Sequence, residues 1–366
     1  MDSSTLNDTV AMRTRLPLAA TLGRPATDRR AAHIATPRIS IAMPTTGYAE
    51  PFERCFRQAI GSLRPDLGDE LLVVFDGAAP PPPAWLAESG ATLLATGHRV
   101  GPAAARNLAA EAAHGDVLFF VDADVELAPD ALERVRAAFT ADPDLCGVFG
   151  AYDAEPAAPG LVSRFRNLLH HHTHLRHAGP AETFWSGCGA MRTGAFLDLG
   201  GFDARYREPS IEDIELGSRA VAAGGRLRLD PAIACTHHKR WTLGSMIFTD
   251  VFRRAVPWTR HMLAMGNVTQ RLNLDWRSRA SGACAVLAGL AALAAPFLPW
   301  AVVPMLACLA AILLMNHDFY ALCTRQGGLA FAAGSFLLHW LYFAYATLTF
   351  AVLVAQDRLR RVSCAR

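Results

Sequence analysis

Residues 115–124 read GDVLFFVDAD, and this stretch decides how the chain folds. The apolar run from Val117 to Val121 has the length and composition of a buried β-strand, and it leads directly into Asp122 and Asp124. In an extended backbone, side chains two residues apart point to the same side. Paired carboxylates at a strand's carboxyl end can hold a divalent cation whose remaining ligands are substrate phosphates. The stretch therefore predicts a strand that ends in a metal–phosphate site.

The sequence on both sides of this strand alternates between strand and helix patterns. Alternation of this kind predicts an α/β domain with a mostly parallel sheet. Ligands of such sheets bind beyond the carboxyl ends of the strands, where Asp76, Asp122 and Asp124 are expected. The predicted strands cover 38–43, 70–75, 92–95, 117–121 and 232–236, and the predicted helices cover 50–63, 103–113 and 129–139.

Composition excludes several classes of function. The 366 residues carry 35 basic and 33 acidic side chains, and this near balance gives no reason to expect a nucleic-acid partner. The eight cysteines are scattered and contain no CxxC pair. Their spacing argues against a zinc site or a disulfide framework and is typical of a reducing compartment.

The chain divides into three parts. Residues 1–37 lack a sustained apolar period, which predicts a disordered leader, and 38–260 form the predicted α/β domain. The rest, 261–366, begins with an interfacial segment and then becomes apolar: 280–316 and 326–356 contain no Asp, Glu, Lys or Arg.

These apolar runs predict transmembrane helices, since a span needs about 20 apolar residues. The second run makes one span. The first, broken by prolines, makes either a hairpin of two short spans or one kinked span, so the total is two or three. Arginines flank the region on both sides, which by the positive-inside rule favours an even number. Either total predicts a multi-pass protein of the cytoplasmic (inner) membrane with the α/β domain facing the cytoplasm.

Five motifs occur in a recognisable order: IAMPT at 41–45, VVFDG at 73–77, GPAAARN at 101–107, DAD at 122–124 and ED at 212–213. Over residues 38–260 this order resembles family 2 glycosyltransferases with the GT-A fold. The resemblance implies transfer of a sugar from a nucleotide-sugar donor with inversion, with Mg²⁺ or Mn²⁺ as cofactor.

By position in the resembled family, Pro44 and Thr45 would line the nucleoside pocket. Asp76 would accept a hydrogen bond from the base, expected to be uracil. The sequence departs from the family pattern here, because Phe75 stands where the first Asp of the usual Asp-Asp-Gly signature would be. The expected donor is therefore a nucleotide-sugar, UDP-linked if the pocket survives this change.

The resemblance makes Asp124 the direct metal ligand, with Asp122 contacting the ribose or the metal and His237 as a further ligand. An EF-hand loop starting at Asp122 is excluded, since Leu127 occupies its glycine position and a strand precedes it. Arg106 follows a helix start, where a guanidinium suits a phosphate or these carboxylates.

Asp213, in the first turn of a predicted helix, is the expected general base that deprotonates the acceptor hydroxyl. Glu212 would orient it or bind the acceptor. Lys239 and Arg240 would clamp the diphosphate. Arg240-Trp241 resembles the Arg-Trp of processive synthases, but the Gln that begins that motif is missing.

The segment FWSGCGAMR at 184–192 borders donor sugar and acceptor in the resembled family. Trp185 would stack on a sugar face or fill the core, and Trp241 is a second candidate substrate contact. Gly187 and Gly189 would let the backbone approach a ligand closely. Cys188 has no base partner in the sequence and is expected to be a packing residue.

A histidine-rich run at 169–177 has three open interpretations: an interfacial or structural helix, an acceptor contact, or a second metal site. Residues 246–258 are apolar and basic, which predicts another interfacial helix.

The sequence thus predicts a membrane-anchored, inverting, metal-dependent glycosyltransferase whose acceptor is a membrane lipid or lipid-linked glycan. A polyprenyl-phosphate sugar transferase is the alternative enzyme, since a phosphate acceptor needs no base. A membrane scaffold with a degenerate transferase domain is the non-enzymatic alternative, supported by Phe75 alone. A nucleotidyltransferase is disfavoured because no glycine-rich basic loop follows the first strand.

Overall fold

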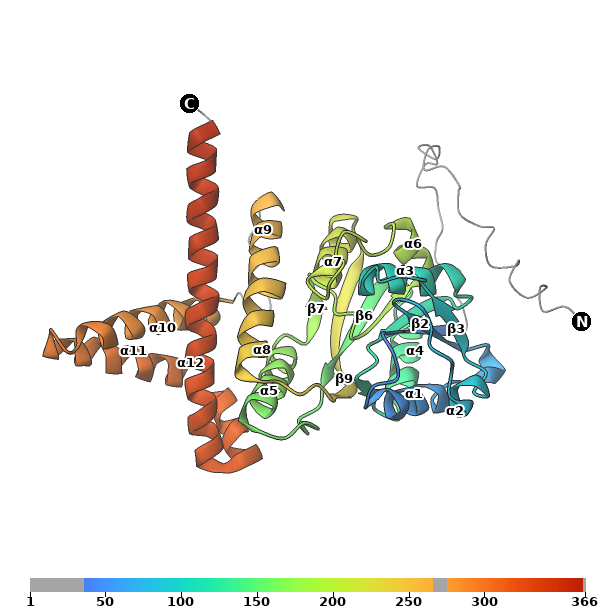
Figure 1. The fold of residues 1–366 in the computed structure, drawn as a ribbon, viewed down its shortest axis with the longest axis horizontal. Coiled ribbons are helices and arrows are strands. Elements are labelled where there is room, and N and C mark those ends of the chain that lie inside the picture. Colours follow the sequence, from blue (N-terminus) through green and yellow to red (C-terminus); the bar gives the residue numbers. More distant parts are fainter. Residues whose placement is uncertain (1–35, 266–274, 365–366) are drawn as a thin grey trace, which may run out of the picture. The chain divides into compact units, whose positions relative to one another are not determined.

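The computed structural model describes residues 36–265 and 275–364. Almost all of the predicted leader and nine residues of the predicted interfacial segment therefore lie outside the described residues. Figure 1 shows the ribbon of the remainder, in which a sheet flanked by helices is followed by a series of C-terminal helices.

The described strands form one nine-stranded sheet in the order β3-β2-β1-β4-β8-β6-β9-β5, with β7 pairing β9. The strands are β1 (Ile39–Thr45), β2 (Glu70–Phe75), β3 (Thr92–Ala95), β4 (Val117–Val121), β5 (Val125–Leu127), β6 (Leu145–Tyr152), β7 (Gly179–Ala181), β8 (Cys188–Arg192) and β9 (Arg226–His237).

The parallel pairing expected from the strand–helix alternation holds for β3-β2-β1-β4. Beyond β4 the sheet is mixed: β8 runs antiparallel to β4 and β6, β6 and β9 are parallel, and β5 and β7 pair β9 antiparallel. The sheet is therefore a parallel half joined to a mixed half through β8, and the junction falls directly beside Asp122.

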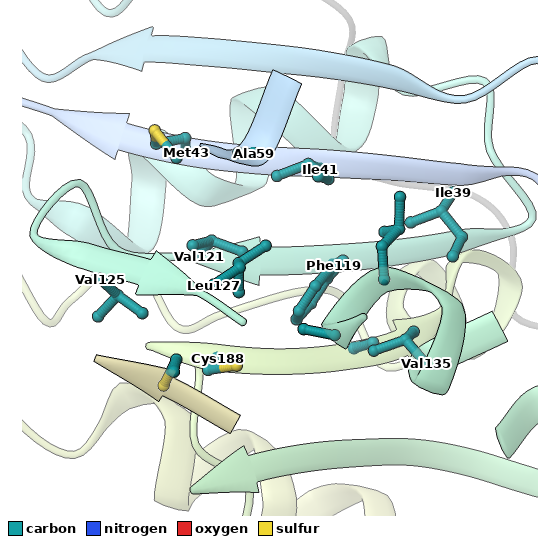
Figure 2. Packing of buried hydrophobic residues seen from close by; sticks show 14 of the residues in the cluster. Ile39, Ile41, Met43, Ala59, Phe119, Val121, Val125, Leu127, Val135 and Cys188 are labelled. Atoms are coloured by element: carbon teal, nitrogen blue, oxygen red, sulfur yellow. The ribbon is translucent and has the colours of Figure 1, made fainter. Parts of the chain in front are cut away.

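Strands at the centre of the sheet are apolar on both sides because helices cover both faces. Ile39, Ile41 and Met43 of β1 pack on one face together with Phe119 and Val121 of β4 (Figure 2). The intervening side chains of the same strands pack on the other face, against helices α3 and α7. This strict alternation fixes the register and thereby the direction in which the residues after each strand point.

Seven helices of the N-terminal part surround the sheet. They are α1 (Phe52–Gly61), α2 (Ala84–Ala87), α3 (Pro102–Ala112), α4 (Ala131–Ala141), α5 (Leu161–Arg176), α6 (Thr193–Asp198) and α7 (Glu212–Ala222). A short 3₁₀ turn, η1 (Pro65–Leu67), precedes β2.

After β9 the chain forms α8 (Leu243–Phe248), a π-helical turn η2 (Thr249–Ala255) and α9 (Val256–Met265). A capping box between Thr242 and Ser245 begins α8. The predicted helix at 246–258 is confirmed, although a π-helical turn interrupts it. Such turns occur mostly at functional sites, because they redirect side chains within a helix.

The C-terminal helices are α10 (Trp276–Ala294), η4 (Pro299–Ala301), α11 (Val302–Met315) and α12 (His317–Cys364). α10 and α11 pair as a helical hairpin whose turn contains Pro296 and Pro299. Left-handed Gly328 (φ +74°) interrupts α12. Apolar side chains of α5, α8 and α12 pack together, so this region shares a core with the sheet domain.

Among the described residues, one helix is long and apolar enough to cross a membrane, at His317–Ser363, and a shorter apolar segment covers Pro299–Met315. The predicted total was two or three. The first apolar run folds into the predicted alternative of a hairpin, but its helices are too short or too polar to count as spans by length and composition.

Candidate active site

A single cavity of about 1350 Å³ contains nearly all of the predicted site residues. It extends from the carboxyl ends of β1, β2 and β4 past the start of α7 to α5, η2, α9 and α12. Two predicted residues, Gly189 and Arg240, do not line it. The predicted residues that do are Pro44, Thr45, Asp76, Arg106, Asp122, Asp124, Trp185, Gly187, Glu212, Asp213, His237, Lys239 and Trp241.

Arg106 connects the two predicted carboxylate motifs. Its guanidinium donates to Asp122 Oδ1 at 2.6 Å and to Glu212 Oε1 at 3.2 Å, and the side chain is only 5% exposed. Arg106 therefore fulfils the second of its predicted roles, pairing with the carboxylates. Glu212 Oε2 also accepts from the Ser210 backbone N–H at 2.8 Å, which holds the start of α7 in place.

Asp124 and His237 approach one another from the ends of β4 and β9. His237 Nε2 lies 3.5 Å from Asp124 Oδ2, and the imidazole stacks on Tyr152 with ring centroids 4.7 Å apart. Burial by itself would raise the pKa of the Asp124 carboxyl, but the hydrogen bond and charge of His237 outweigh burial and lower it. Asp124 is therefore held ready as an anion.

A carboxylate oxygen and an imidazole nitrogen are suitable donors for Mn²⁺, and a carboxylate suits Mg²⁺. Within the described residues, no group of three or more His, Cys, Asp or Glu side chains is arranged to hold a metal. Asp124 and His237, with Asp122 nearby in sequence, fit a cation that takes its other ligands from phosphates and water.

Asp213 lies at the first turn of α7, facing the same cavity. Its Oδ2 accepts from the Ser186 backbone N–H at 3.1 Å and its Oδ1 from the Ile214 N–H at 2.8 Å. Burial raises the pKa of the Asp213 carboxyl to about 7, and the neighbouring Glu212 carboxylate adds to the rise, whereas Arg106 opposes it. A carboxyl with this pKa can accept a proton near neutral pH.

The end of the cavity where the nucleoside is expected contains residues at the ends of β1 and β2 and in the loops that follow them. Thr45 Oγ1 accepts from the Gly47 N–H at 3.2 Å, and Asp76 accepts from the backbone N–H groups of Val100 and Gly101 at 2.8 and 3.1 Å. Asp76 thus orders the loop that begins α3. Phe75, the departure from the family pattern, is 1% exposed and packs in the core.

Gly187 and Gly189 are required for packing. A Cβ on Gly187 would lie 2.7 Å from the Trp185 ring, and one on Gly189 would lie 2.2 Å from the Trp185 carbonyl oxygen. The two glycines therefore allow Trp185 to lie against β8. The ring of Trp185 packs against the core, as one of the two predicted alternatives has it, and it also lines the cavity, which leaves stacking on a sugar a prediction.

Three aromatic side chains form the wall beside Trp185: two belong to the histidine-rich run, and the third, Tyr152, was not identified from the sequence. Tyr152 contacts Trp185 edge to face, with centroids 4.9 Å apart, and His170 and His174 of α5 lie against the same ring at 6.0 and 5.3 Å. The predicted helix of the histidine-rich run is confirmed, and two of its histidines line the cavity. Their spacing, one helical turn apart, was the signal in the sequence.

Lys239 lies over the Trp241 ring, with Nζ 4.4 Å from the centroid. The backbone N–H of Trp241 donates to Ser163 Oγ at 2.9 Å, which fixes the segment after β9 on α5. Arg240 is exposed and is not among the residues that line the cavity. Of the predicted cationic pair, Lys239 alone borders the cavity.

A second charged cluster, formed by Arg166, Asp250, Arg254 and Tyr345, borders the cavity between α5, η2 and α12. Asp250 Oδ1 accepts from Arg166 at 2.5 Å, and its Oδ2 accepts from the Tyr345 hydroxyl at 2.6 Å. Sequence reasoning missed these residues. The signal that could have identified them is a buried Asp within the otherwise apolar and basic 246–258 segment.

Comparison with known proteins agrees with this geometry. Residues 40–200 match the family model described as glycosyl transferase family 2. The pre-mycofactocin glycosyltransferases of two strains of Mycobacterium tuberculosis are each 28% identical to the chain. The matches cover 66% of this chain and 52% of those proteins, so the chain spans about half the length of these curated relatives.

Among solved structures, a mannosyltransferase from Pyrobaculum calidifontis in complex with GDP-Man and Mn²⁺ is similar over 89% of both chains. The TM-score is 0.54 and the sequence identity 18%, a likeness of fold. The expected α/β architecture of the GT-A type is thereby confirmed, with a sheet that is mixed where a mostly parallel one was expected and with one helix long and apolar enough to span among the described residues. The ordered motifs, the likeness of fold and the family match over residues 40–200 together make the chain similar to glycosyl transferase family 2.

Proposed function

We propose that the chain is an inverting, metal-dependent glycosyltransferase that moves a sugar from a nucleotide-sugar to a hydroxyl of a membrane lipid or lipid-linked glycan. The observation that carries this proposal is that Asp213, half-buried and with its pKa raised to about 7, opens onto the same cavity as Asp122 and Asp124. A base and a diphosphate site on one cavity are what a direct displacement requires.

In this mechanism the acceptor hydroxyl oxygen attacks the anomeric carbon while Asp213 takes the hydroxyl proton. The bond from that carbon to the diphosphate oxygen breaks, and its electron pair leaves with the nucleoside diphosphate. Attack opposite the leaving group inverts the configuration. Ser186 orients Asp213 through its backbone N–H, and Arg106 together with Glu212 holds the base at the start of α7.

Asp124 and His237, with Asp122, would hold Mg²⁺ or Mn²⁺ in this site. A bound cation would neutralise the negative charge that develops on the diphosphate. The structurally similar mannosyltransferase, solved with GDP-Man and Mn²⁺, supports the choice of a nucleotide-sugar and of Mn²⁺ as the first ion to test. UDP-linked sugars remain the first donors to test, because Asp76 lies at the predicted base position.

We also propose that the C-terminal helices enter the cytoplasmic membrane while the sheet domain faces the cytoplasm. α12 beyond Gly328 is long enough to cross the bilayer, and large apolar side chains are exposed on the three helices of this region. They include Leu290, Leu293 and Phe297 of the α10–α11 hairpin and its turn, and Leu329, Leu337 and Leu348 of α12. Such a surface suits hydrocarbon rather than water.

The test is nucleotide release by the detergent-purified chain, with Mn²⁺, a membrane-lipid extract and a panel of UDP- and GDP-sugars. We expect lipid-stimulated release from one donor, abolished by Asp124→Ala and reduced about 10²–10⁴-fold by Asp213→Asn. Loss in Asp124→Ala alone would favour transfer to a phosphate oxygen, which needs no base. Absence of both release and nucleotide binding would favour a scaffold.

A further inference from the structure

Three cationic side chains that are remote in sequence from the proposed catalytic carboxylates line the cavity. They are Arg166 of α5, Lys239 after β9 and Arg254 of η2. The guanidinium groups of Arg166 and Arg254 share one carboxylate oxygen, Asp250 Oδ1, at 2.5 and 3.5 Å. The other oxygen of Asp250 is occupied by the Tyr345 hydroxyl. One carboxylate therefore neutralises two guanidiniums only in part.

The positive charge of this wall is in excess. Burial lowers the pKa of Arg254, and repulsion from Arg166 lowers it further, although Asp250 opposes both effects. The buried Nε of Arg166 has no hydrogen-bond partner in the described structure. These groups form a site prepared for an anion.

The site lies between the catalytic residues and the apolar helices. The carbonyl oxygen of Arg253 accepts from Ser210 Oγ at 2.9 Å, so η2 contacts the segment that leads into Glu212 and Asp213. From the same turn, Asp250 contacts Tyr345 of α12. Beyond η2 the cavity lining includes the apolar side chains Trp258, Met262, Phe343, Ala346 and Phe350, together with Thr259, Ser278, Arg279 and Thr347.

We propose that Arg254 and Arg166 bind a phosphate group of the acceptor, and that the hydrocarbon chain of that acceptor lies along the α9–α12 side of the cavity. The acceptor class is then a lipid phosphate or lipid diphosphate, with its reacting group beyond the phosphate, toward Asp213. The inference rests on the proposed function and specifies the substrate class of the same site.

The arrangement of surfaces along the cavity carries this assignment. η2 contacts the segment before Glu212 and Asp213 through Arg253 and contacts α12 through Asp250, so its cations connect the carboxylates with the apolar helices. This arrangement matches a reacting group, a phosphate and a lipid chain. Guanidinium groups suit phosphate because they present paired donors. The diphosphate of the donor offers the same chemistry, so the experiment must separate these two sources.

The experiment measures binding to the detergent-purified full chain by thermal shift and by tryptophan fluorescence, since Trp241 and Trp258 line the cavity. The probes are farnesyl phosphate, farnesol, inorganic phosphate, UDP and GDP, the nucleotides with Mn²⁺. We expect farnesyl phosphate to bind at least about 10-fold more tightly than farnesol or phosphate, because a charged hydrogen bond and apolar burial then add.

Arg254→Gln should weaken farnesyl phosphate binding about 10- to 100-fold and leave nucleotide affinity unchanged. Arg254→Lys should restore part of the loss, which separates a lost charge from a damaged fold. Arg260→Gln is the matched control, because Arg260 is an exposed cation one and a half turns further along, outside the cavity lining.

Three results would overturn the inference. The first is that farnesol binds as tightly as farnesyl phosphate, and the second is that Arg254→Gln and Arg260→Gln have the same affinity for farnesyl phosphate. The third is that Arg254→Gln loses affinity for nucleotide and keeps its affinity for farnesyl phosphate. The last would assign the cations to the donor diphosphate. Because nucleotide binding is read separately, a protein that binds UDP or GDP but not farnesyl phosphate keeps the proposed function and loses this inference.

Discussion

Arg106 lies 3.2 Å from Glu212, across 106 positions of sequence, and both side chains are almost fully buried. This ion pair links α3 to α7 at the cavity lining. The other terminal nitrogen of the guanidinium donates a hydrogen bond to Asp122. The geometry of the base at the start of α7 is thereby coupled to that of the carboxylates after β4.

Arg106→Gln should destabilise the protein by about 3–5 kcal/mol, because Glu212 is left as a buried charge without its partner. Thermal unfolding in detergent measures this change. Arg57→Gln is the control: its pair with Glu53 on α1 is exposed and is expected to contribute about 0.3–0.5 kcal/mol. Equal effects of the two substitutions would show that the buried pair has no structural role.

The rate of sugar transfer should rise with pH through a midpoint near 7, since Asp213 accepts the acceptor proton only when ionised. Arg106 lowers the pKa of Asp213, so a folded Arg106 variant should move the midpoint to higher pH. Initial rates between pH 5 and 9, at saturating donor, measure both. A flat profile across this range would contradict the role of Asp213 as base.

Asp213→Asn should make the protein more stable at pH 8, by about 2–4 kcal/mol. Folding raises the pKa of Asp213 from 3.8 to about 7. Between these pH values the folded state holds a proton on this carboxyl that the unfolded state has released. The stability of the wild type therefore falls as pH rises from about 4 to 7, and the variant escapes that loss.

The difference between variant and wild type should vanish near pH 4, where both side chains are neutral. Thermal unfolding at pH 4 and 8 provides the comparison. Asp198→Asn, an exposed carboxylate at the end of α6, should change neither value. If Asp213→Asn is less stable than the wild type at pH 8, the ionised Asp213 side chain stabilises the folded state. The expectation that this ionised side chain destabilises the fold would then be wrong.

Chelation with EDTA should abolish nucleotide release, and Mn²⁺ should restore it. His237→Ala should raise the Mn²⁺ concentration needed for half-maximal release about 10- to 100-fold, since a ligand to the ion is lost. His238→Ala is the control, because its imidazole pairs with Glu126 at 2.7 Å and does not line the cavity. Identical metal requirements in the two variants would remove His237 from the ion site.

The predicted strands matched best where the local pattern was strongest. Residues 70–75, 92–95 and 117–121 were predicted with the observed bounds of β2, β3 and β4. β8 was not predicted, because the segment has Gly187 just before it and Gly189 within it, and glycine is depleted in strands. Both glycines are needed for the Trp185 side chain, which the pattern of β8 alone does not reveal. Strand pairing in the mixed half of the sheet depends on contacts of this kind between residues far apart in the sequence.

The catalytic residues were predicted from motifs, because each lies directly after a strand or at a helix start. The Arg166–Asp250–Tyr345 cluster has no such local mark. Its members lie 84 and 95 positions apart and meet only when η2 lies between α5 and α12. Side chains that meet through tertiary packing of irregular or apolar segments leave no periodic signal in the sequence.

Through the hydrogen bond from Tyr345 to Asp250, the longest described helix, α12, forms part of the cavity in addition to its proposed role as a membrane anchor. It supplies one wall of the reaction chamber, including Phe343 and Phe350. A shortened protein that ends before residue 317 would leave that chamber open to water on one side. Replacing the helix with an unrelated anchor should thus preserve location in the cell while losing recognition of the acceptor.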